Sequence, residues 1–132
     1  MLVDTNVLVD VLANDPEWAD WSIAQLRAQA QIHRLHINPV IHAELSLTFS
    51  TVEALEGTLA ALQIPVTEIP RPALFLAGKA FVQYRRRGGT KSNVLADFII
   101  GAHAAVAEWP VLTRDVRRYV GYFPTVALVS PD

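Results

Sequence analysis

The stretch Met1-Leu2-Val3-Asp4-Thr5-Asn6 begins with apolar residues that run directly into an acid, a hydroxyl and an amide. Residues 2–4 have the length and apolar character of a short buried strand, and a helical apolar pattern begins at residue 6. In an open α/β sheet, ligands bind in the crevice outside the carboxyl ends of the strands. The stretch therefore predicts that Asp4 lies where such a fold binds its ligand. The alternative is that Asp4, Thr5 or Asn6 only caps the next helix, a position that Asp, Thr and Asn all favour.

Short apolar strands alternate with helical segments along the rest of the chain. We expect further strands at 35–38, 64–69, 111–113 and 126–129, and helices at 6–13, 16–32, 39–49, 51–62, 72–87, 94–108 and 116–120. This alternation is typical of a parallel sheet with helices on both faces. No internal repeat or linker divides the sequence. We therefore expect an α/β fold, a three-layer α/β/α sandwich with a short central parallel sheet, in a single domain of residues 1–132.

The composition indicates a folded protein without disulfides. Hydrophobic residues make up 52% of the 132 residues, which argues against intrinsic disorder. No run reaches the roughly 18 apolar residues of a membrane span. Asp4 and Asp10 interrupt the first residues, so we predict no secretory signal. The absence of cysteine excludes disulfides and thiolate metal sites, and a cytoplasmic protein is expected.

The charges are unevenly distributed, although the net charge is only −2. Seven of the 11 basic residues lie between residues 85 and 118. A basic footprint is typical of nucleic-acid binders, whose cations contact phosphates. Arg85, Arg86, Lys91 and Arg114 are the candidates for such contacts. For the residues at the end of helix 72–87, a solvated helix terminus is an equally good explanation.

Three further acids fall at places comparable with Asp4. Glu44 lies one turn into the helix after the second strand, Asp97 lies in the first turn of a nearly all-apolar helix, and Asp115 follows the fourth strand. A buried charged carboxylate is costly unless it is paired or bound to metal, so Asp97 needs a metal ion or a nearby arginine such as those at 85–87. Glu44 could instead be a solvated helix residue, and Asp115 a helix cap.

Together the four acids predict a metal site at one edge of the sheet. Carboxylates that share one place raise each other's pKa unless a cation neutralises them. Oxygen ligands without cysteine or paired histidine favour Mg²⁺ or Mn²⁺ over zinc. Such ions activate water and stabilise the attacking and leaving oxygens at a phosphodiester. The chemistry that these acids imply is metal-assisted phosphodiester hydrolysis.

The sequence resembles PIN-domain ribonucleases, and most closely the VapC toxins of bacterial toxin–antitoxin modules. The resemblance covers the whole chain and is carried by Val3-Asp4-Thr5-Asn6, by Glu44, by Leu95-Ala96-Asp97-Phe98-Ile99-Ile100-Gly101-Ala102-His103-Ala104 and by Leu112-Thr113-Arg114-Asp115. It implies a Mg²⁺-dependent endoribonuclease, with Mn²⁺ as a substitute ion. Its catalytic residues would be Asp4, Glu44, Asp97 and Asp115.

The same resemblance implies further roles and partners. Asp4, Asp97 and Asp115 would hold the metal, and Asn6 and Thr113 would be supporting polar groups. The implied partners are an RNA substrate, a VapB-like antitoxin that covers the site, and a second copy of the chain in a homodimer.

Two other classes of function stay open from the residues alone. A receiver-like regulatory module has the same layout and an acidic metal pocket, but the chain lacks an adjacent acidic pair near the first strand. A non-catalytic interaction domain would hold a partner peptide in its crevice. The sequence contains no Gly-rich phosphate loop between a strand and a helix, and its four histidines are too scattered for a zinc motif.

Overall fold

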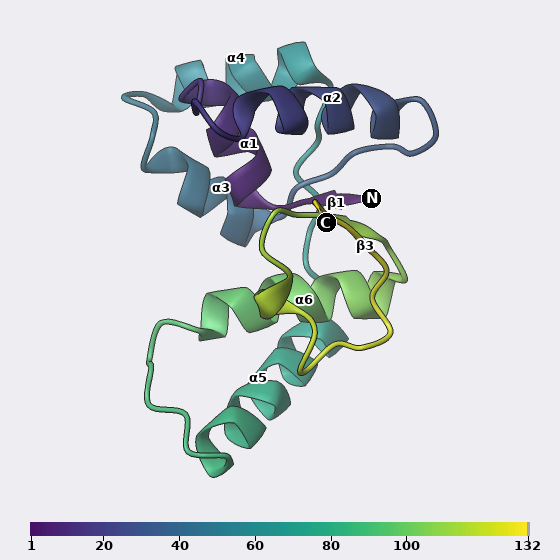
Figure 1. Ribbon diagram of the computed structural model, residues 1–132. Coiled ribbons are helices and arrows are strands. Elements are labelled where there is room, and N and C mark those ends of the chain that lie inside the picture. The colour runs from purple at the N-terminus through teal and green to yellow at the C-terminus, as the bar shows by residue number, and fades with distance from the viewer. Residues whose placement is uncertain (132) are drawn as a thin grey trace.

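The computed structural model describes residues 1–131, in which helices lie on both sides of a short parallel sheet (Figure 1). The elements are β1 (Leu2–Val3), α1 (Thr5–Leu12), α2 (Ala19–Ala30), α3 (Pro39–Ser46), α4 (Val52–Leu62), α5 (Arg71–Arg86), α6 (Leu95–Ala107), β2 (Val111–Leu112), the 3₁₀-helix η1 (Val116–Arg118) and β3 (Leu128–Val129). In Figure 1, α1 to α4 lie above the sheet, and α5 and α6 lie below it. The predicted α/β/α arrangement is confirmed.

The strands all pair in parallel, with β1 beside β2 and β2 beside β3. Two isolated parallel bridges continue the pattern on the other side of β1, from Leu2 to His36 and from Ile37 to Val66. The five predicted strands therefore lie in the order third, second, first, fourth, fifth. The order reverses at β1, so the carboxyl end of β1 is the switch point at which open α/β sheets bind ligands.

The second and third predicted strands are shorter than we expected. Single bridges at His36, Ile37 and Val66 replace strands over 35–38 and 64–69. Pro39 and Pro65 flank these bridges, and proline has no amide hydrogen with which to extend a ladder. The predictions were correct in position and direction but too long.

Several helices also differ from the sequence prediction in extent, and the helix expected over 39–49 ends at Ser46. The helix expected from residue 16 begins at Ala19, because Asp15 Oδ1 accepts the amides of Glu17 and Trp18, both at 2.9 Å, and holds them in a turn. The helix expected over 116–120 is a 3₁₀-helix that ends at Arg118.

Polar residues before the helices set several helix starts. Asn38 Oδ1 accepts the amide of Ile41 at 2.9 Å and caps α3, whose first residue is proline. Thr51 Oγ1 accepts the amide of Ala54 at 3.1 Å and caps α4. Asp4 likewise caps α1, as the alternative interpretation of Asp4 predicted. The capping bond uses Oδ1 of Asp4, and Oδ2 accepts hydrogen bonds from residues elsewhere in the chain.

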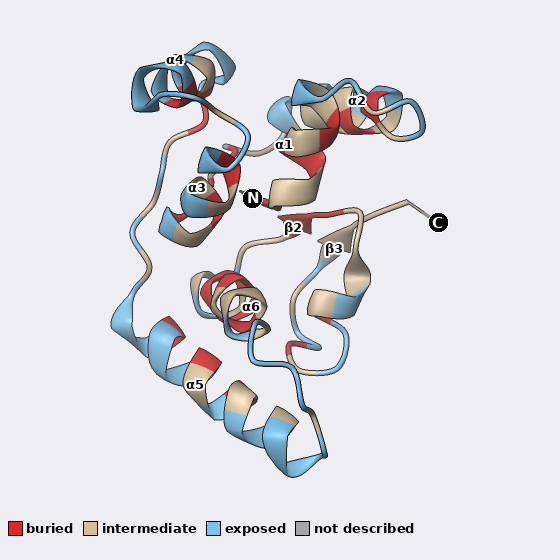
Figure 2. Cartoon of the chain, turned by 90° about the vertical axis from the view of Figure 1, so that its left-hand side faces the viewer, coloured by how far each residue is buried: buried red, intermediate tan, exposed pale blue. Residues whose placement is uncertain are grey.

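The apolar core has two parts. The larger part surrounds β1 and β2, and it includes the fully buried residues Leu2, Val3, Ile37, Ile41 and Leu112. The smaller part lies between α5 and α6, where Ala73, Ala77 and Ala80 face Phe98, Ala102 and Phe123. Figure 2 shows the buried residues of α5 on the side toward α6. None of the helices within residues 1–131 is long and apolar enough to cross a membrane.

His103 of α6 is a buried polar residue whose ring bonds to the cap of α3. Because Asn38 Oδ1 accepts from Ile41, its amide nitrogen faces His103 Nδ1 at 3.2 Å. An amide nitrogen only donates, so His103 Nδ1 must be unprotonated. Burial lowers the pKa of His103, and the charge of His36 acts in the same direction. The fold therefore requires neutral His103.

We predict that acid destabilises the fold through His103. The pKa of His103 is lower in the folded state than in the unfolded chain, where it is about 6.5. The stabilisation that neutral His103 provides is therefore complete above about pH 6.5 and is lost as the pH falls below that value. The measurement is urea unfolding followed by tryptophan fluorescence from about pH 5 to about pH 8. His103→Gln should reduce the pH dependence of the unfolding free energy.

Burial also lowers the pKa of His36, so part of the pH dependence should persist in His103→Gln. His33→Gln, at a less buried position, is the control. An unchanged pH dependence in His103→Gln would contradict the assignment.

Candidate active site

Asp4 lies at the carboxyl end of β1 with no exposure to solvent. Its Oδ1 accepts hydrogen bonds at 2.8 Å from the amide of Thr5 and from Arg118 Nη1. Its Oδ2 accepts hydrogen bonds at 2.8 Å from the hydroxyls of Thr113 and Tyr119. A buried carboxylate needs such partners because its charge has lost the solvation of water. Asp4 is thus held in one orientation by donors from three segments of the chain.

Asn6 and Thr113 join β1 to the loop after β2. The amide nitrogen of Asn6 lies 3.3 Å from Thr113 Oγ1 and 3.5 Å from Asp4 Oδ2, and its Oδ1 accepts the amide of Arg114 at 3.0 Å. Thr113 Oγ1 also accepts the amide of Asp115 at 3.0 Å. Both residues, which the resemblance implied as supporting polar groups, therefore belong to the hydrogen-bond network around Asp4.

The guanidinium of Arg118 lies among three of the four predicted acids. Nη1 is 2.8 Å from Asp4 Oδ1, Nε is 2.9 Å from Asp97 Oδ1, and Nη2 is 3.5 Å from Glu44 Oε2. The hydroxyl of Thr5 donates to Glu44 Oε1. The structure therefore brings together Asp4 after β1, Glu44 on α3 and Asp97 on α6.

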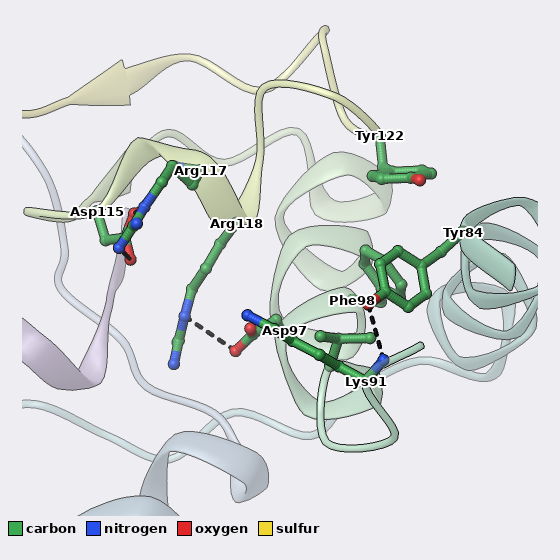
Figure 3. Close-up of a pocket in the computed structure, with 9 residues that line it drawn as sticks. Tyr84, Lys91, Asp97, Phe98, Asp115, Arg117, Arg118 and Tyr122 are labelled. Atoms are coloured by element: carbon green, nitrogen blue, oxygen red, sulfur yellow. Dashed lines mark hydrogen bonds and ion pairs between the residues drawn. The ribbon is translucent and has the colours of Figure 1, made fainter. Parts of the chain in front are cut away.

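Asp115 is the fourth acid and forms its own ion pair. Its carboxylate accepts hydrogen bonds from Arg117 Nε at 2.9 Å and Nη2 at 3.0 Å. It also accepts the amide of Arg117 at 3.1 Å and caps η1, so the capping alternative is confirmed for Asp115. Asp115 and Asp97 nevertheless line the same cavity (Figure 3).

That cavity has a volume of about 330 Å³. Figure 3 shows Asp115, Arg117 and Arg118 on one side of it, and the rings of Tyr84, Phe98 and Tyr122 on the other. Lys91, from the loop between α5 and α6, also lines the cavity. The cavity thus combines carboxylates, cations and aromatic rings next to the acids that surround Arg118.

The charges of the site change the pKa of Asp97 and Arg118. Burial raises the pKa of Asp97, Arg118 acts against this rise, and the carboxylates of Glu44, Asp4 and Asp115 add to it. Burial alone would lower the pKa of Arg118, but Asp4, Asp97 and Glu44 together more than offset it and raise that pKa. Arg118 is therefore the permanent positive charge of the site.

Two neighbouring groups are shifted for different reasons. Burial and the charge of Asp4 raise the pKa of Tyr119 well above its ordinary value. The hydroxyl therefore keeps its proton and donates a hydrogen bond to Asp4. The hydrogen bond from Arg117 lowers the pKa of Asp115, which stays ionised.

The donor atoms of the site are those that a hard divalent cation prefers. Asp4, Glu44 and Asp97 supply carboxylate oxygens, and no cysteine is available to favour a softer ion. In the conformation described for residues 1–131, however, no three acidic or imidazole groups are placed to share a metal ion. The guanidinium of Arg118 lies between these carboxylates and neutralises them. The acids fit a metal chemically, provided that Arg118 moves.

The sequence prediction missed Arg118 and Tyr119. We expected a metal ion or an arginine at 85–87 to neutralise Asp97, but the cation that does so is Arg118. Arg118 was visible only as one member of a basic cluster. The available signal was the position of both residues in the short helical turn after Asp115, which directs them back toward β1.

Arg114 bonds to a different acid. Its Nε and Nη2 donate to the two oxygens of Asp10, both at 2.7 Å, and Ser22 Oγ donates to Asp10 Oδ2 at 3.0 Å. The guanidinium also lies 5.4 Å from the ring centre of Trp18. Arg114 was a candidate for RNA contact, whereas in the structure it links the loop after β2 to α1 and α2.

The other candidates for RNA contact lie at or beyond the end of α5. Arg85 donates to the carbonyl oxygens of Gly89 and Thr90, both at 3.4 Å. Arg86 and Lys91 are exposed, and Lys91 is the one that lines the cavity.

Comparisons with known proteins agree with this architecture. The chain matches the PIN domain family over residues 1–120. No curated protein matches the sequence.

Several solved toxin–antitoxin structures have a similar fold. VapBC2 from Rickettsia felis, solved with a promoter DNA fragment, is 18% identical, with a TM-score of 0.75 over 99% of this chain and 98% of that chain. DNA-bound VapBC from Salmonella typhimurium is 21% identical, with a TM-score of 0.68 over 98% and 96%. VapBC-1 from nontypeable Haemophilus influenzae is 16% identical, with a TM-score of 0.70 over 98% and 96%. At these identities the likeness shows the fold alone.

Arg114 and Arg117, two arginines near the site, form ion pairs that differ in burial and so provide a matched test. Arg114 pairs with Asp10, whose side chain is 2% exposed, whereas Arg117 is itself 88% exposed. We predict that Arg114→Gln lowers the unfolding free energy by about 2–3 kcal/mol, because it leaves a buried carboxylate without its cation. Arg117→Gln should cost much less, because solvent screens its exposed ion pair with Asp115. Urea unfolding measures both, and equal losses would contradict the assigned burial.

Proposed function

Because the chain belongs to the PIN domain family, we propose that it is a metal-dependent endoribonuclease that hydrolyses RNA phosphodiester bonds and acts as the toxin of a toxin–antitoxin pair. The observation that carries this proposal is the convergence of Asp4, Glu44 and Asp97, from three separate elements, at the carboxyl end of β1. Asp115 lies on the adjoining cavity. Acids that converge at a switch point can supply the oxygen ligands that metal-assisted hydrolysis uses.

In this proposal Asp4, Asp97 and Asp115 hold Mg²⁺, with Mn²⁺ as a substitute. The bound ion would activate water and neutralise charge at the phosphodiester. Tyr119 and Thr113 fix Asp4 before substrate arrives, so the central carboxylate needs no reorganisation.

Glu44 is the acid that we assign to proton transfer. The hydroxyl of Thr5 donates to its Oε1, which orients the side chain toward the site. The other oxygen, Oε2, lies 3.5 Å from Arg118 and is the atom that would accept a proton from the attacking water. Its side chain is partly exposed, so water can reach it.

The cavity is the proposed place for the RNA next to the cleaved bond. Single-stranded RNA is bound by cations near its phosphates and by aromatic rings on which bases stack. Lys91 and Arg117 supply cations, and Tyr84 and Tyr122 supply partly exposed rings. We propose that Arg85 and Arg86 extend this path along the end of α5. Arg114 is a weaker candidate because it is bonded to Asp10.

We also propose that the protein acts in the cytoplasm as a homodimer, bound by a VapB-like antitoxin that covers the acids. The similar folds found in VapBC complexes support a partner of this kind. The whole of residues 1–132 would form a single PIN domain.

One prediction of this proposed function concerns the metal site. Asp97→Asn should reduce cleavage at least about 100-fold, because a carboxylate that holds the ion is worth several kcal/mol at the transition state. The assay is cleavage of total RNA by purified protein with Mg²⁺, with Mn²⁺ and with EDTA. Discrete fragments should form with either ion and be absent with EDTA.

Asp20→Asn makes the same chemical change at an exposed position of α2 and is the control. Circular dichroism verifies that both variants fold. Wild-type cleavage by Asp97→Asn would rule out the assigned role. A folded wild-type protein, free of antitoxin, that cleaves no RNA would favour a non-catalytic or receiver-like module.

Another prediction of this proposed function concerns the path of the RNA along the cavity and the end of α5. Arg86→Gln and Lys91→Gln should each weaken binding of single-stranded RNA regardless of its sequence, because each removes a phosphate contact. The logarithm of affinity against the logarithm of salt concentration should lose roughly 0.7 from its slope per contact. Fluorescence anisotropy with EDTA present measures binding without cleavage. Arg27→Gln, on an exposed face of α2, should keep both affinity and slope.

A further inference from the structure

The guanidinium of Arg118 points a different nitrogen at each of three acids. Nη1 faces Asp4, Nε faces Asp97 and Nη2 faces Glu44. Only 21% of its side chain is exposed, so solvent screens these contacts weakly. A guanidinium does not lose its charge, so raising the pH does not release these acids.

The oxygens that Arg118 binds are also those that a divalent cation would need. On Asp4, Oδ2 already accepts the hydroxyls of Thr113 and Tyr119, which leaves Oδ1 as the oxygen directed into the site. Arg118 binds that Oδ1 and also Asp97 Oδ1. A divalent cation between the same carboxylates would be repelled by the guanidinium of Arg118, because charges a few ångströms apart interact strongly where solvent is scarce.

The fold provides space for Arg118 to leave the acids. Its side chain lines the cavity beside Asp97, as Figure 3 shows, so rotation of the side chain alone would move the guanidinium outward. The backbone of η1 can stay in place, since Tyr119 remains bonded to Asp4 and Asp115 caps η1.

We infer that Arg118 is an internal cation that competes with the divalent metal for Asp4 and Asp97, and so sets the metal concentration at which the site fills. This inference rests on the proposed metal site. Without metal, Arg118 keeps the acids together and stabilises the fold. When metal binds, Arg118 moves into the cavity. The residue is thus a positioning residue that controls how easily the site is loaded.

The experiment is calorimetric titration of Mn²⁺ into metal-free protein without RNA. Arg118→Gln should bind Mn²⁺ at least about tenfold more tightly than wild type, because the competing charge is gone. Arg118→Lys keeps a positive charge and should bind more weakly than Arg118→Gln. Arg27→Gln removes an equal charge at an exposed position of α2 and should bind as wild type does.

Thermal melting gives a second measurement. In EDTA, Arg118→Gln should melt at a lower temperature than wild type, because the carboxylates repel one another. Mn²⁺ should raise its melting temperature more than that of wild type. An equal or smaller increase in the melting temperature of Arg118→Gln would contradict competition between Arg118 and the metal.

Wild-type protein also allows a test that does not depend on the folding of any glutamine variant. The Nε–H resonance of Arg118, assigned with Arg118→Lys, should shift when Mg²⁺ is added, because its bond to Asp97 breaks. The Nε–H resonance of Arg114, bonded to Asp10, should stay in place. An Arg118 resonance that does not move while Mg²⁺ binds would overturn the inference.

Asp97→Asn separates failure of this inference from failure of the proposed function. If Mn²⁺ binding is lost in Asp97→Asn but equally tight in wild type and Arg118→Gln, the metal site stands and the competition is refuted. If neither wild type nor folded Arg118→Gln binds Mn²⁺, the metal site itself is refuted, and the role of Arg118 with it.

Discussion

The buried charge of Asp4 is the constraint on which the rest of the site depends. A carboxylate without access to water must be surrounded by donors, and those of Asp4 come from residues next to it and from a segment more than 100 residues away. Thr113, Arg118 and Tyr119 can reach it only because β2 pairs in parallel with β1. The pairing of two short strands and the neutralisation of one acid are therefore parts of the same arrangement.

The same charge connects the two helical layers. Glu44 belongs to α3 on one side of the sheet, and Asp97 belongs to α6 on the other. The guanidinium of Arg118 contacts both acids as well as Asp4. Groups that would repel one another are thereby held together by a single guanidinium, which favours a stable fold.

Much of the fold and the positions of the four acids in it were predictable, because they leave local patterns. Apolar periodicity located each helix of the described residues, although the strands predicted around residues 36 and 66 were too long. Asp4 and Asp115 each follow a predicted strand, which indicated that both lie at the carboxyl edge of the sheet. The ion pairs were not predictable, because an arginine near an acid in sequence can reach a different acid in space. Arg114 adjoins Asp115 but bonds to Asp10.

The positions of strands and helices along the chain and the supply of acids therefore follow from local chemistry, since hydrophobic spacing and turn residues act over a few neighbours. The choice of partner for each charge was decided only when the chain folded. Arg117 and Arg118 are adjacent residues of the same type, yet one is exposed on Asp115 and the other lies among three acids. Their difference comes from the direction of each side chain on a single helical turn, and the burial that follows sets the strength of each interaction.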